Sequence, residues 1–212
     1  MQDEAGTPLS PADPQPAPTQ SPDPTSANPT SADPTGPGAR VSRRGLFGLL
    51  VVVAVVSYAA DQLTKIWALA ALVPGDPVDI VGEYIRLNLI RNPGAAFSIG
   101  NGATWVLTLI AFAVLVFILV TARRLGSVGW AWALGMLLGG SVGNLTDRML
   151  REPGPGRGHV VDFIDYFGLF IGNVADIFIV GAAILIALLA VRGIGVDGVR
   201  PERGRHEAGS HA

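Results

Sequence analysis

Four apolar segments, each close to the length of a membrane-crossing helix, constrain this sequence most strongly. They are Leu46–Leu72, Trp105–Ala122, Val128–Leu145 and Val174–Val191. A helix needs about 20 mostly apolar residues to span the hydrocarbon core of a bilayer. Four such segments within 212 residues, of which only 15% are charged, are too many to be the buried helices of a soluble domain. The sequence therefore predicts an all-α membrane fold with four transmembrane helices.

Basic residues predict the orientation of these helices. Cytoplasmic loops of membrane proteins are enriched in Lys and Arg. Nine arginines lie before the first segment, after the second or after the fourth: Arg40, Arg43, Arg44, Arg123, Arg124, Arg192, Arg200, Arg203 and Arg205. With four spans these three regions share one side of the membrane, so we predict that both termini are cytoplasmic.

The segments outside the predicted spans differ in character. Residues 1–40 hold ten of the sixteen prolines and no aromatic residue, which predicts a disordered cytoplasmic tail. The membrane domain covers 41–192, and 193–212 form a C-terminal cytoplasmic tail. Residues 85–90 alternate in polarity, and Val78–Val81 can pair with them. This pattern predicts a small extracytoplasmic β-sheet on the outer membrane surface.

Composition removes several classes of function. The net charge of −2 provides no basic excess for a nucleic acid. The chain has no cysteine, which excludes a thiolate nucleophile and cysteine-ligated metals. No cluster of residues suggests a metal ion or another cofactor.

Polar residues gather at the ends of the spans that the predicted topology places outside. Asp61 and Lys65 lie four residues apart on one helical face, where opposite charges can pair. The other members of this layer are Asn92, Asn144, Asp147, Arg148, Asp162, Asp165, Asn173 and Asp176. Ionisable groups inside membrane helices are costly and are commonly functional, so this layer is the candidate site.

Simpler roles exist for individual members of this layer. Asn173 can cap the fourth helix, with Asp176 near its positive end. Asp147 and Arg148 can form an interfacial ion pair, and Asp165 can be an ordinary loop charge. None of these roles accounts for four segments that deliver carboxylates and amides to the same layer.

Two adjacent carboxylates have a specific chemical use. They share a proton because both cannot ionise at short distance, and one can then act as general base while the other acts as general acid. This is the chemistry of an aspartic peptidase. By residue pattern alone, the partner of Asp176 is either Asp147 or Asp162. A weaker alternative combines His159 with one of the serines Ser57, Ser98 and Ser141.

Two functions from other classes compete with a peptidase. A small proton-coupled membrane transporter would carry polar residues near the middle of several spans, yet the second span contains only Thr108 in its interior. A membrane assembly factor without enzymatic activity would not need convergent aspartates.

The polar blocks, taken in order, resemble those of the bacterial lipoprotein signal peptidases, also called signal peptidase II. The resemblance covers about residues 45–191. It rests on "DQLTK" at 61–65, "NPGAAFS" at 92–98, "GNLTDR" at 143–148, "HVVDFID" at 159–165 and "NVAD" at 173–176. This chain departs from the family at Gly172, where Phe is common, and in the link at 152–157.

The resemblance implies an integral membrane aspartic endopeptidase of the bacterial inner (plasma) membrane, with its active site near the extracytoplasmic surface. Such enzymes remove signal peptides from diacylglyceryl-modified prolipoproteins, cleaving on the N-terminal side of the lipidated cysteine. The implied catalytic pair is Asp162 and Asp176, which activate a water molecule. The implied supporting residues are Asp61, Lys65, Asn92, Gly94, Asn144, Asp147, Arg148, Asn173 and Ala175. We expect a monomer that contacts prolipoprotein and membrane lipid, and no cofactor.

Overall fold

The computed structural model describes residues 42–94 and 104–199. Contacts divide the chain into two units, Met1–Ala39 and Arg40–Ala212, and every described residue belongs to the second. The predictions for the N-terminal tail, for residues 200–212 and for Ser98 lie outside the described residues.

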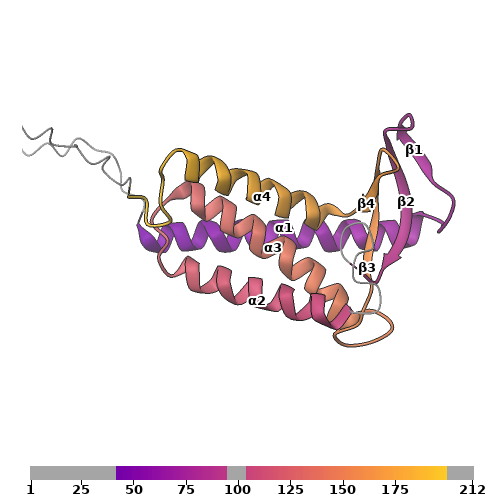
Figure 1. Ribbon diagram of the computed structural model, residues 1–212, viewed down its shortest axis with the longest axis horizontal. Coiled ribbons are helices and arrows are strands. Elements are labelled where there is room, and N and C mark those ends of the chain that lie inside the picture. The colour runs from indigo at the N-terminus through magenta and orange to yellow at the C-terminus, as the bar shows by residue number, and fades with distance from the viewer. Residues whose placement is uncertain (1–41, 95–103, 200–212) are drawn as a thin grey trace, which may run out of the picture. The chain divides into compact units, whose positions relative to one another are not determined.

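Four helices form the body of the second unit. They are α1 (Arg43–Ala71), α2 (Thr104–Ala122), α3 (Val128–Leu150) and α4 (Val174–Val191) (Figure 1). Each begins or ends within a few residues of the apolar segment predicted for it. Ser42 begins α1 by accepting a hydrogen bond from the backbone N–H of Gly45 at 3.2 Å, as expected of a serine N-cap.

Three of these helices, α1, α2 and α4, are long and apolar enough to cross a membrane. Helix α3 is not among them, so the prediction of four transmembrane helices is only partly confirmed. The physical reason lies in its neighbours: α3 packs against all three other helices, whereas α2 and α4 have few buried residues. A helix surrounded by protein does not need a continuous apolar surface.

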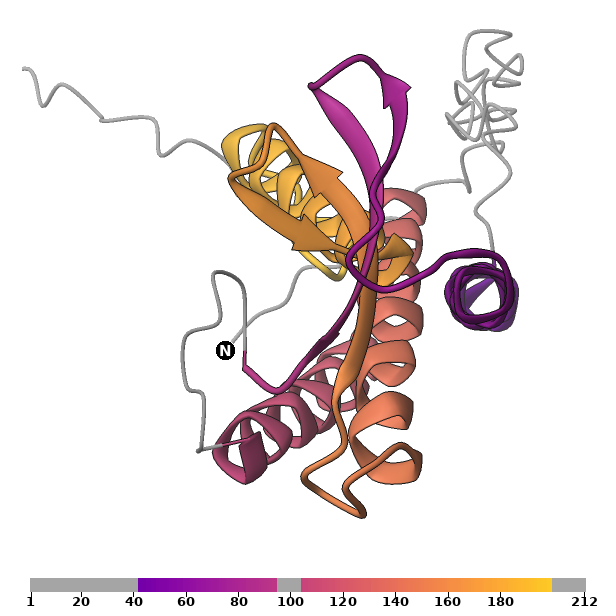
Figure 2. The same ribbon diagram turned by 90° about the vertical axis from the view of Figure 1, so that its right-hand side faces the viewer.

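Small residues allow α3 to occupy this central position. A side chain at Gly139 would collide with the backbone oxygen of Ala54 and with Ser57, both on α1. A side chain at Gly140 would meet the backbone oxygen of Ala175 on α4. Glycines at such positions let helix backbones approach closely. Figure 2 shows α1, α2 and α4 arranged on different sides of α3.

A four-stranded antiparallel sheet lies across one end of the helices. Its strands are β1 (Val78–Val81), β2 (Ile85–Asn92), β3 (Val160–Tyr166) and β4 (Phe170–Gly172), paired in sequence order (Figures 1 and 2). The hairpin of the first two strands was predicted from alternation. Strands β3 and β4 were not predicted, and β3 places Asp162 within the sheet.

Successive side chains of β3 point to opposite faces of the sheet, and this sets the direction of Asp162. Val161 and Phe163 are buried in a cluster with Ala68 of α1 and Leu89 of β2. The ring of Phe163 also meets that of Trp67 edge-on, with centroids 6.3 Å apart. Because successive residues of a strand point to opposite faces, Asp162 points away from this cluster.

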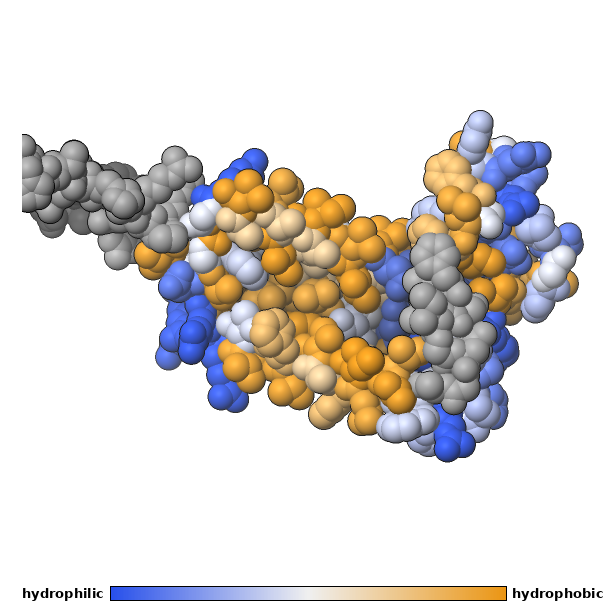
Figure 3. Space-filling model, viewed as in Figure 1, coloured by the Kyte–Doolittle hydropathy of each residue, from blue (hydrophilic) through white to orange (hydrophobic). Residues whose placement is uncertain are grey.

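The opposite end of the bundle carries the loop between α2 and α3. Residues 193–199 lie against this loop, with the backbone N–H of Gly126 donating to Val196 at 2.9 Å and the indole N–H of Trp130 donating to Ile194 at 2.9 Å. Figure 3 shows an apolar band over the helices with hydrophilic residues at both ends. The band is the surface expected of a protein that sits in a bilayer.

Candidate active site

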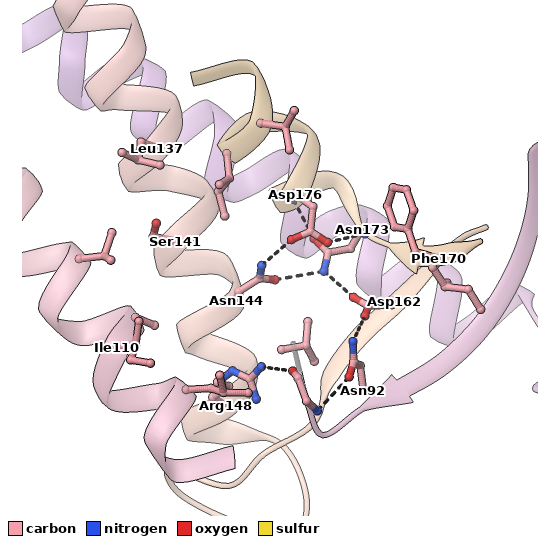
Figure 4. A pocket seen from close by; sticks show the side chains of 18 residues that line it. Asn92, Ile110, Leu137, Ser141, Asn144, Arg148, Asp162, Phe170, Asn173 and Asp176 are labelled. Carbon is pink, nitrogen blue, oxygen red and sulfur yellow. Dashed lines mark hydrogen bonds between the residues drawn. The ribbon is translucent and has the colours of Figure 1, made fainter. Parts of the chain in front are cut away.

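A cavity of about 540 Å³ lies where the helices meet the sheet (Figure 4). Apolar side chains of α2, α3 and α4 line most of it, among them Leu107, Ile110, Val114, Leu137, Ile179 and Val180. Its polar part is lined by Asn92, Gly94, Ser141, Asn144, Arg148, Asp162, Asn173 and Asp176. The cavity therefore joins an apolar groove to a cluster of carboxylates and amides.

Asp162 enters this cavity from β3 and is 2% exposed. Its Oδ2 accepts a hydrogen bond from Asn92 Nδ2 at 2.8 Å, and its Oδ1 accepts one from Asn173 Nδ2 at 2.6 Å. Ile90 of β2 pairs with Asp162, which puts Asn92 on the same face as Asp162, as a diagonal neighbour. The pairing of β2 with β3 thus sets the contact between Asn92 and Asp162.

Asp176 enters from the first turn of α4. Asn173 caps this helix by accepting from the backbone N–H of Asp176 at 3.2 Å, while Asp176 Oδ2 accepts from the backbone N–H of Asn173 at 3.0 Å. This reciprocal capping box confirms the predicted cap. The same geometry holds the carboxylate of Asp176 at the cavity wall.

Asparagines connect the two carboxylates. Asn144 Nδ2 donates to Asp176 Oδ1 at 3.0 Å, and Asn144 Oδ1 accepts from Asn173 Nδ2 at 3.1 Å. Asn173 Nδ2 also donates to Asp162. One continuous network therefore runs from Asp176 through two amides to Asp162, as the dashed lines in Figure 4 show.

Burial perturbs the acidity of Asp162. Removal from water, with a smaller contribution from the negative charge of Asp176, raises the pKa of its carboxyl to about 6. Hydrogen bonds from Asn92 and Asn173 favour the ionised form and hold the pKa below the value that burial alone would give. A carboxyl group with this pKa can carry or release a proton near neutral pH.

A buried charge cluster lies beside this network. Lys65 Nζ is 2.9 Å from Asp61 Oδ2 and 2.8 Å from Asp147 Oδ2, and all three side chains are fully buried. Lys65 also donates to Asn144 Oδ1 at 2.9 Å. The predicted pair of Asp61 with Lys65 is confirmed, but the second carboxylate on Lys65 was not predicted.

The carboxylates of this cluster also bind backbone groups. Asp61 Oδ1 accepts from the backbone N–H of Ala175 at 3.0 Å, and Asp147 Oδ2 accepts from that of Val161 at 3.2 Å. Both backbone groups lie next to a candidate catalytic aspartate in the chain. The cluster therefore fixes the positions of β3 and of the first turn of α4.

Arg148 holds the turn after β2. Its Nη2 donates to the backbone oxygen of Gly94 at 2.6 Å, and the backbone N–H of Gly94 donates to Asn92 Oδ1 at 2.9 Å. The Nη1 atom of Arg148 is buried and has no hydrogen-bond partner among the described residues. Arg148 is also one of the residues that line the cavity.

Two of the simpler roles considered for single residues are wrong. Asp147 does not pair with Arg148: besides Lys65 it binds Arg151 on the next helical turn. Asp165 is not a loop charge but a buried residue of β3, 2.8 Å from Arg86 Nη2 on β2. Sequence spacing missed the second pair because its partners are 79 residues apart.

The two aspartates considered as partners of Asp176 lie in different surroundings. Asp162 shares the amide network and the cavity with Asp176, whereas Asp147 belongs to the Lys65 cluster and does not line the cavity. Ser141 lines the cavity, but within residues 42–94 and 104–199 no hydrogen bond joins it to His159. In the same part of the chain, no group of three His, Asp or Glu side chains is placed to hold a metal ion.

Comparisons with known proteins agree on the nature of this chain. The family model described as signal peptidase (SPase) II matches residues 53–192. The lipoprotein signal peptidase of Mycobacterium tuberculosis (strain ATCC 25618 / H37Rv) is 51% identical over 151 residues, covering 71% of this chain and 75% of the relative. The lipoprotein signal peptidase of Leifsonia xyli subsp. xyli (strain CTCB07) is 47% identical over 157 residues, covering 74% of this chain and 73% of the relative.

Two solved structures of bacterial membrane enzymes are similar to this chain. A bacterial membrane enzyme determined by the in meso method at 2.3 Å resolution is 26% identical with a TM-score of 0.62, covering 68% of this chain and 88% of that one. A second such structure, at 1.9 Å resolution, is also 26% identical and has a TM-score of 0.60. The match covers 68% of this chain and 94% of that one.

The apolar helices and the similar solved structures indicate a membrane enzyme, and the family model and the relatives make this enzyme a peptidase. The chain belongs to the signal peptidase II family, which matches about two thirds of its length. It is therefore a hydrolase with several apolar helices, and the transporter hypothesis is not favoured.

Proposed function

We propose that this chain is an aspartic endopeptidase that removes signal peptides from diacylglyceryl-modified prolipoproteins, with Asp162 and Asp176 as its catalytic pair. The observation that carries the proposal is the amide network that joins these two carboxylates at the polar end of an apolar cavity. A substrate that carries both a peptide bond and acyl chains needs such a combination. Cleavage on the N-terminal side of the lipidated cysteine follows from the family.

The proposed reaction uses one proton on the pair. Asp162 is the protonated member, because burial favours its neutral form. Ionised Asp176 takes a proton from water, and the water oxygen attacks the scissile carbonyl carbon. Asp162 donates its proton to the carbonyl oxygen. The tetrahedral intermediate then breaks its C–N bond as a proton passes from Asp176 to the leaving nitrogen. One hydroxyl group of the intermediate returns a proton to Asp162 and becomes the carbonyl of the product carboxyl group, which restores the starting state of the pair.

Neighbouring groups position the substrate and the pair. Arg148 Nη1, which lacks a partner among the described residues, donates to a substrate carbonyl in this proposal. Asn92, Asn144 and Asn173 hold the two carboxylates, and Gly94 lets the chain pass close to the cavity. Asp61, Lys65, Asp147 and Ala175 support the site through the buried charge cluster. No step requires a metal ion or other cofactor.

The proposed membrane arrangement follows from the distribution of charge. Arg43, Arg44, Arg123 and Arg124 lie at the end of the bundle opposite to the sheet, and this end is cytoplasmic in our proposal, with both termini. Helix α3 is then the fourth span, shielded from lipid by the other three helices. The sheet lies on the outer surface of the bacterial inner membrane, over the scissile bond.

The substrate enters sideways from the bilayer in this arrangement. Helix α2 packs mainly against α3 and has at most slight contact with α4, yet both α2 and α4 line the cavity. The apolar groove between them would hold the signal segment and acyl chains. We propose that a monomer suffices, with residues 1–40 and 193–212 as cytoplasmic tails of a membrane domain spanning 41–192.

Replacement of each aspartate tests the proposal. The variants Asp162→Asn and Asp176→Asn are incubated in detergent with a diacylglyceryl-modified precursor, and the shortened product is measured. Both should lose at least about 10³-fold in rate, while size-exclusion profiles and thermal midpoints stay close to those of the parent. Full activity in either folded variant would overturn the assignment.

Two control variants make this result specific. Asp147→Asn removes a carboxylate of the Lys65 cluster and should retain part of the activity, because Asp147 does not line the cavity. Asp79→Asn changes an exposed carboxylate on β1 and should be indistinguishable from the parent. If Asp147→Asn abolished cleavage in a folded protein and Asp162→Asn did not, Asp147 would be the partner of Asp176.

A further inference from the structure

A second cavity, of about 480 Å³, lies between the start of α1 and the end of α2, at the end of the bundle away from the sheet. Three arginines are among the residues that line it, Arg43, Arg44 and Arg123. Phe47 and Leu119 line the same cavity and are 55% and 50% exposed. The cavity is separate from the aspartate site, and the peptidase reaction does not use it.

The charge of this cavity is not compensated by the protein. Its lining contains no acidic residue. Within residues 42–94 and 104–199, none of the three guanidinium groups forms an ion pair with a carboxylate. The first turn of α1 brings the positive end of a helix dipole and the last turn of α2 the negative end of another, so the three arginines carry the charge of the site. The site therefore favours an anion with several acceptor oxygens, and a phosphate group fits guanidinium donors in this way.

The apolar part of the cavity specifies the rest of the ligand. Phe47 lies about one helical turn from Arg43, and Leu119 one turn from Arg123, in both cases toward the middle of the helix. A ligand with its phosphate on the arginines would extend alkyl chains over Phe47 and Leu119 into the bilayer. Basic cavities between membrane helices on the cytoplasmic side are suited to anionic lipid head groups.

We propose that this cavity binds an anionic phospholipid, with its phosphodiester on Arg43, Arg44 and Arg123 and its acyl chains along Phe47 and Leu119. The proposed membrane topology assigns this lipid to the cytoplasmic leaflet, but the binding itself does not depend on the peptidase mechanism. Helices α1 and α2 have at most slight direct contact. The lipid therefore adds a link between two helices that also meet in the buried cluster of Leu46, Leu50, Ile118 and Ala122.

Such a bridge affects the aspartate site through α2. The same helix lines the apolar part of the first cavity through Leu107, Ile110 and Val114. A lipid that fixes the inner end of α2 to α1 restricts the movement of α2 relative to α4, and hence the width of the groove in which the substrate is proposed to lie.

Native mass spectrometry tests the proposal. The full chain in detergent is mixed with equal amounts of phosphatidylglycerol and phosphatidylcholine, and the lipid that stays bound is measured. The parent should retain phosphatidylglycerol preferentially. The double variant Arg43→Gln/Arg123→Gln should lose about 30-fold in affinity for it, since each arginine close to an anionic head group contributes about fivefold. The matched control Arg124→Gln/Arg192→Gln removes the same charge from the same end of the bundle, outside the cavity, and should bind as the parent does.

Two further measurements distinguish a phospholipid from other possible ligands. Phe47→Ala keeps every charge and should still weaken the binding of phosphatidylglycerol, because the acyl chains lose a contact. If the double variant does not fold, the binding measured for Phe47→Ala tests the proposal in its place. Inorganic phosphate at equal concentration should not displace the lipid. Equal loss in both double variants, equal binding of both lipids, or displacement by phosphate would each overturn the proposal.

A segment of this chain is the remaining competitor for the cavity. Residues 1–40 contain five acidic residues and one basic residue. If this segment filled the cavity, the full chain would show no preference for phosphatidylglycerol, which would also overturn the proposal. Cleavage assays are not needed for any of these outcomes, so a failure here is distinct from a failure of the proposed peptidase mechanism.

Discussion

Lys65 and Asn144 form the link between the buried charge cluster and the aspartate site. Lys65 Nζ donates to Asn144 Oδ1 at 2.9 Å, which turns the amide of Asn144 so that its Nδ2 donates to Asp176 at 3.0 Å. A lysine on α1 thereby determines which end of an α3 side chain faces the carboxylate on α4. The buried charge cluster therefore affects the aspartate site by orienting the amide of Asn144, and Lys65 does not contact Asp176 in this network.

Replacement of Lys65 by methionine should destabilise the protein strongly. Lys65 is the shared partner of Asp61 and Asp147, and its removal leaves two carboxylates buried without their cation. Removal of one partner of a buried ion pair costs about 3–5 kcal/mol. The thermal midpoint in detergent should fall by several degrees or more relative to Arg124→Met, an exposed control. An unchanged midpoint in Lys65→Met would contradict a structural role for the cluster.

The pH dependence of cleavage should move when Asn92 is replaced by alanine. The pKa of Asp162 is raised to about 6, chiefly by burial, and the hydrogen bond from Asn92 keeps it from rising further by favouring the ionised form. Loss of this bond should therefore raise the pKa further. Since Asp162 must be protonated in the proposed reaction, kcat/KM falls as the pH rises through this pKa.

The measurement is the pH profile of kcat/KM in detergent for the parent and for Asn92→Ala. The parent should show a descending limb with an apparent pKa near 6, and the variant should show that limb at higher pH with a lower maximum. A limb that stayed in place while the maximum fell would mean that Asn92 acts on the substrate and not on Asp162.

Gly172 should be sensitive to the smallest side chain. A Cβ atom there would lie 2.9 Å from Asp176 Oδ2, the oxygen that accepts the hydrogen bond from the Asn173 backbone. Gly172→Ala should displace the carboxylate and reduce kcat/KM by roughly 10- to 100-fold, because a shift of about 1 Å in catalytic geometry has effects of this size.

Gly181→Ala is the matched control for this substitution. Gly181 lies further along α4, and a Cβ atom there meets nothing within 4 Å. Its activity should equal that of the parent. The thermal midpoint of Gly172→Ala should change little, since the lost helix-cap bond contributes about 1 kcal/mol. Equal activity in the two alanine variants would show that Asp176 accommodates a side chain at position 172.

The sequence alone predicted the parts of this protein that depend on local pattern. Hydrophobic length located all four helices, and alternation located the first hairpin. The pair of Asp61 with Lys65 followed from helical spacing. The capping box of Asn173 with Asp176 was likewise visible in the order of residues around the start of α4.

Features that depend on distant pairing were not predictable in this way. Strand β3 was missed because "HVVDFID" is buried on both faces, and such a strand lacks a clean alternation of polar and apolar residues. Without β3, the contact of Asp162 with Asn92, 70 residues apart, could not be placed. The choice between Asp147 and Asp162 as the partner of Asp176 therefore required the family resemblance.

Close packing of α1 against α3 gives a final prediction. A Cβ atom at Gly139 would collide with the backbone oxygen of Ala54 and with Ser57, and backbone atoms cannot move aside as a flexible side chain can. Gly139→Ala should force the two helices apart and destabilise the protein by about 1–3 kcal/mol, the usual cost of overpacking.

Gly48→Ala on α1 is the control, because a Cβ atom at Gly48 meets nothing within 4 Å. Its thermal midpoint in detergent should match or exceed that of the parent, since alanine favours a helix over glycine. Because Asp61 and Lys65 lie on the helix that would move, Gly139→Ala should also lower cleavage more than Gly48→Ala. Equal thermal midpoints in the two variants would contradict the close approach of α1 and α3.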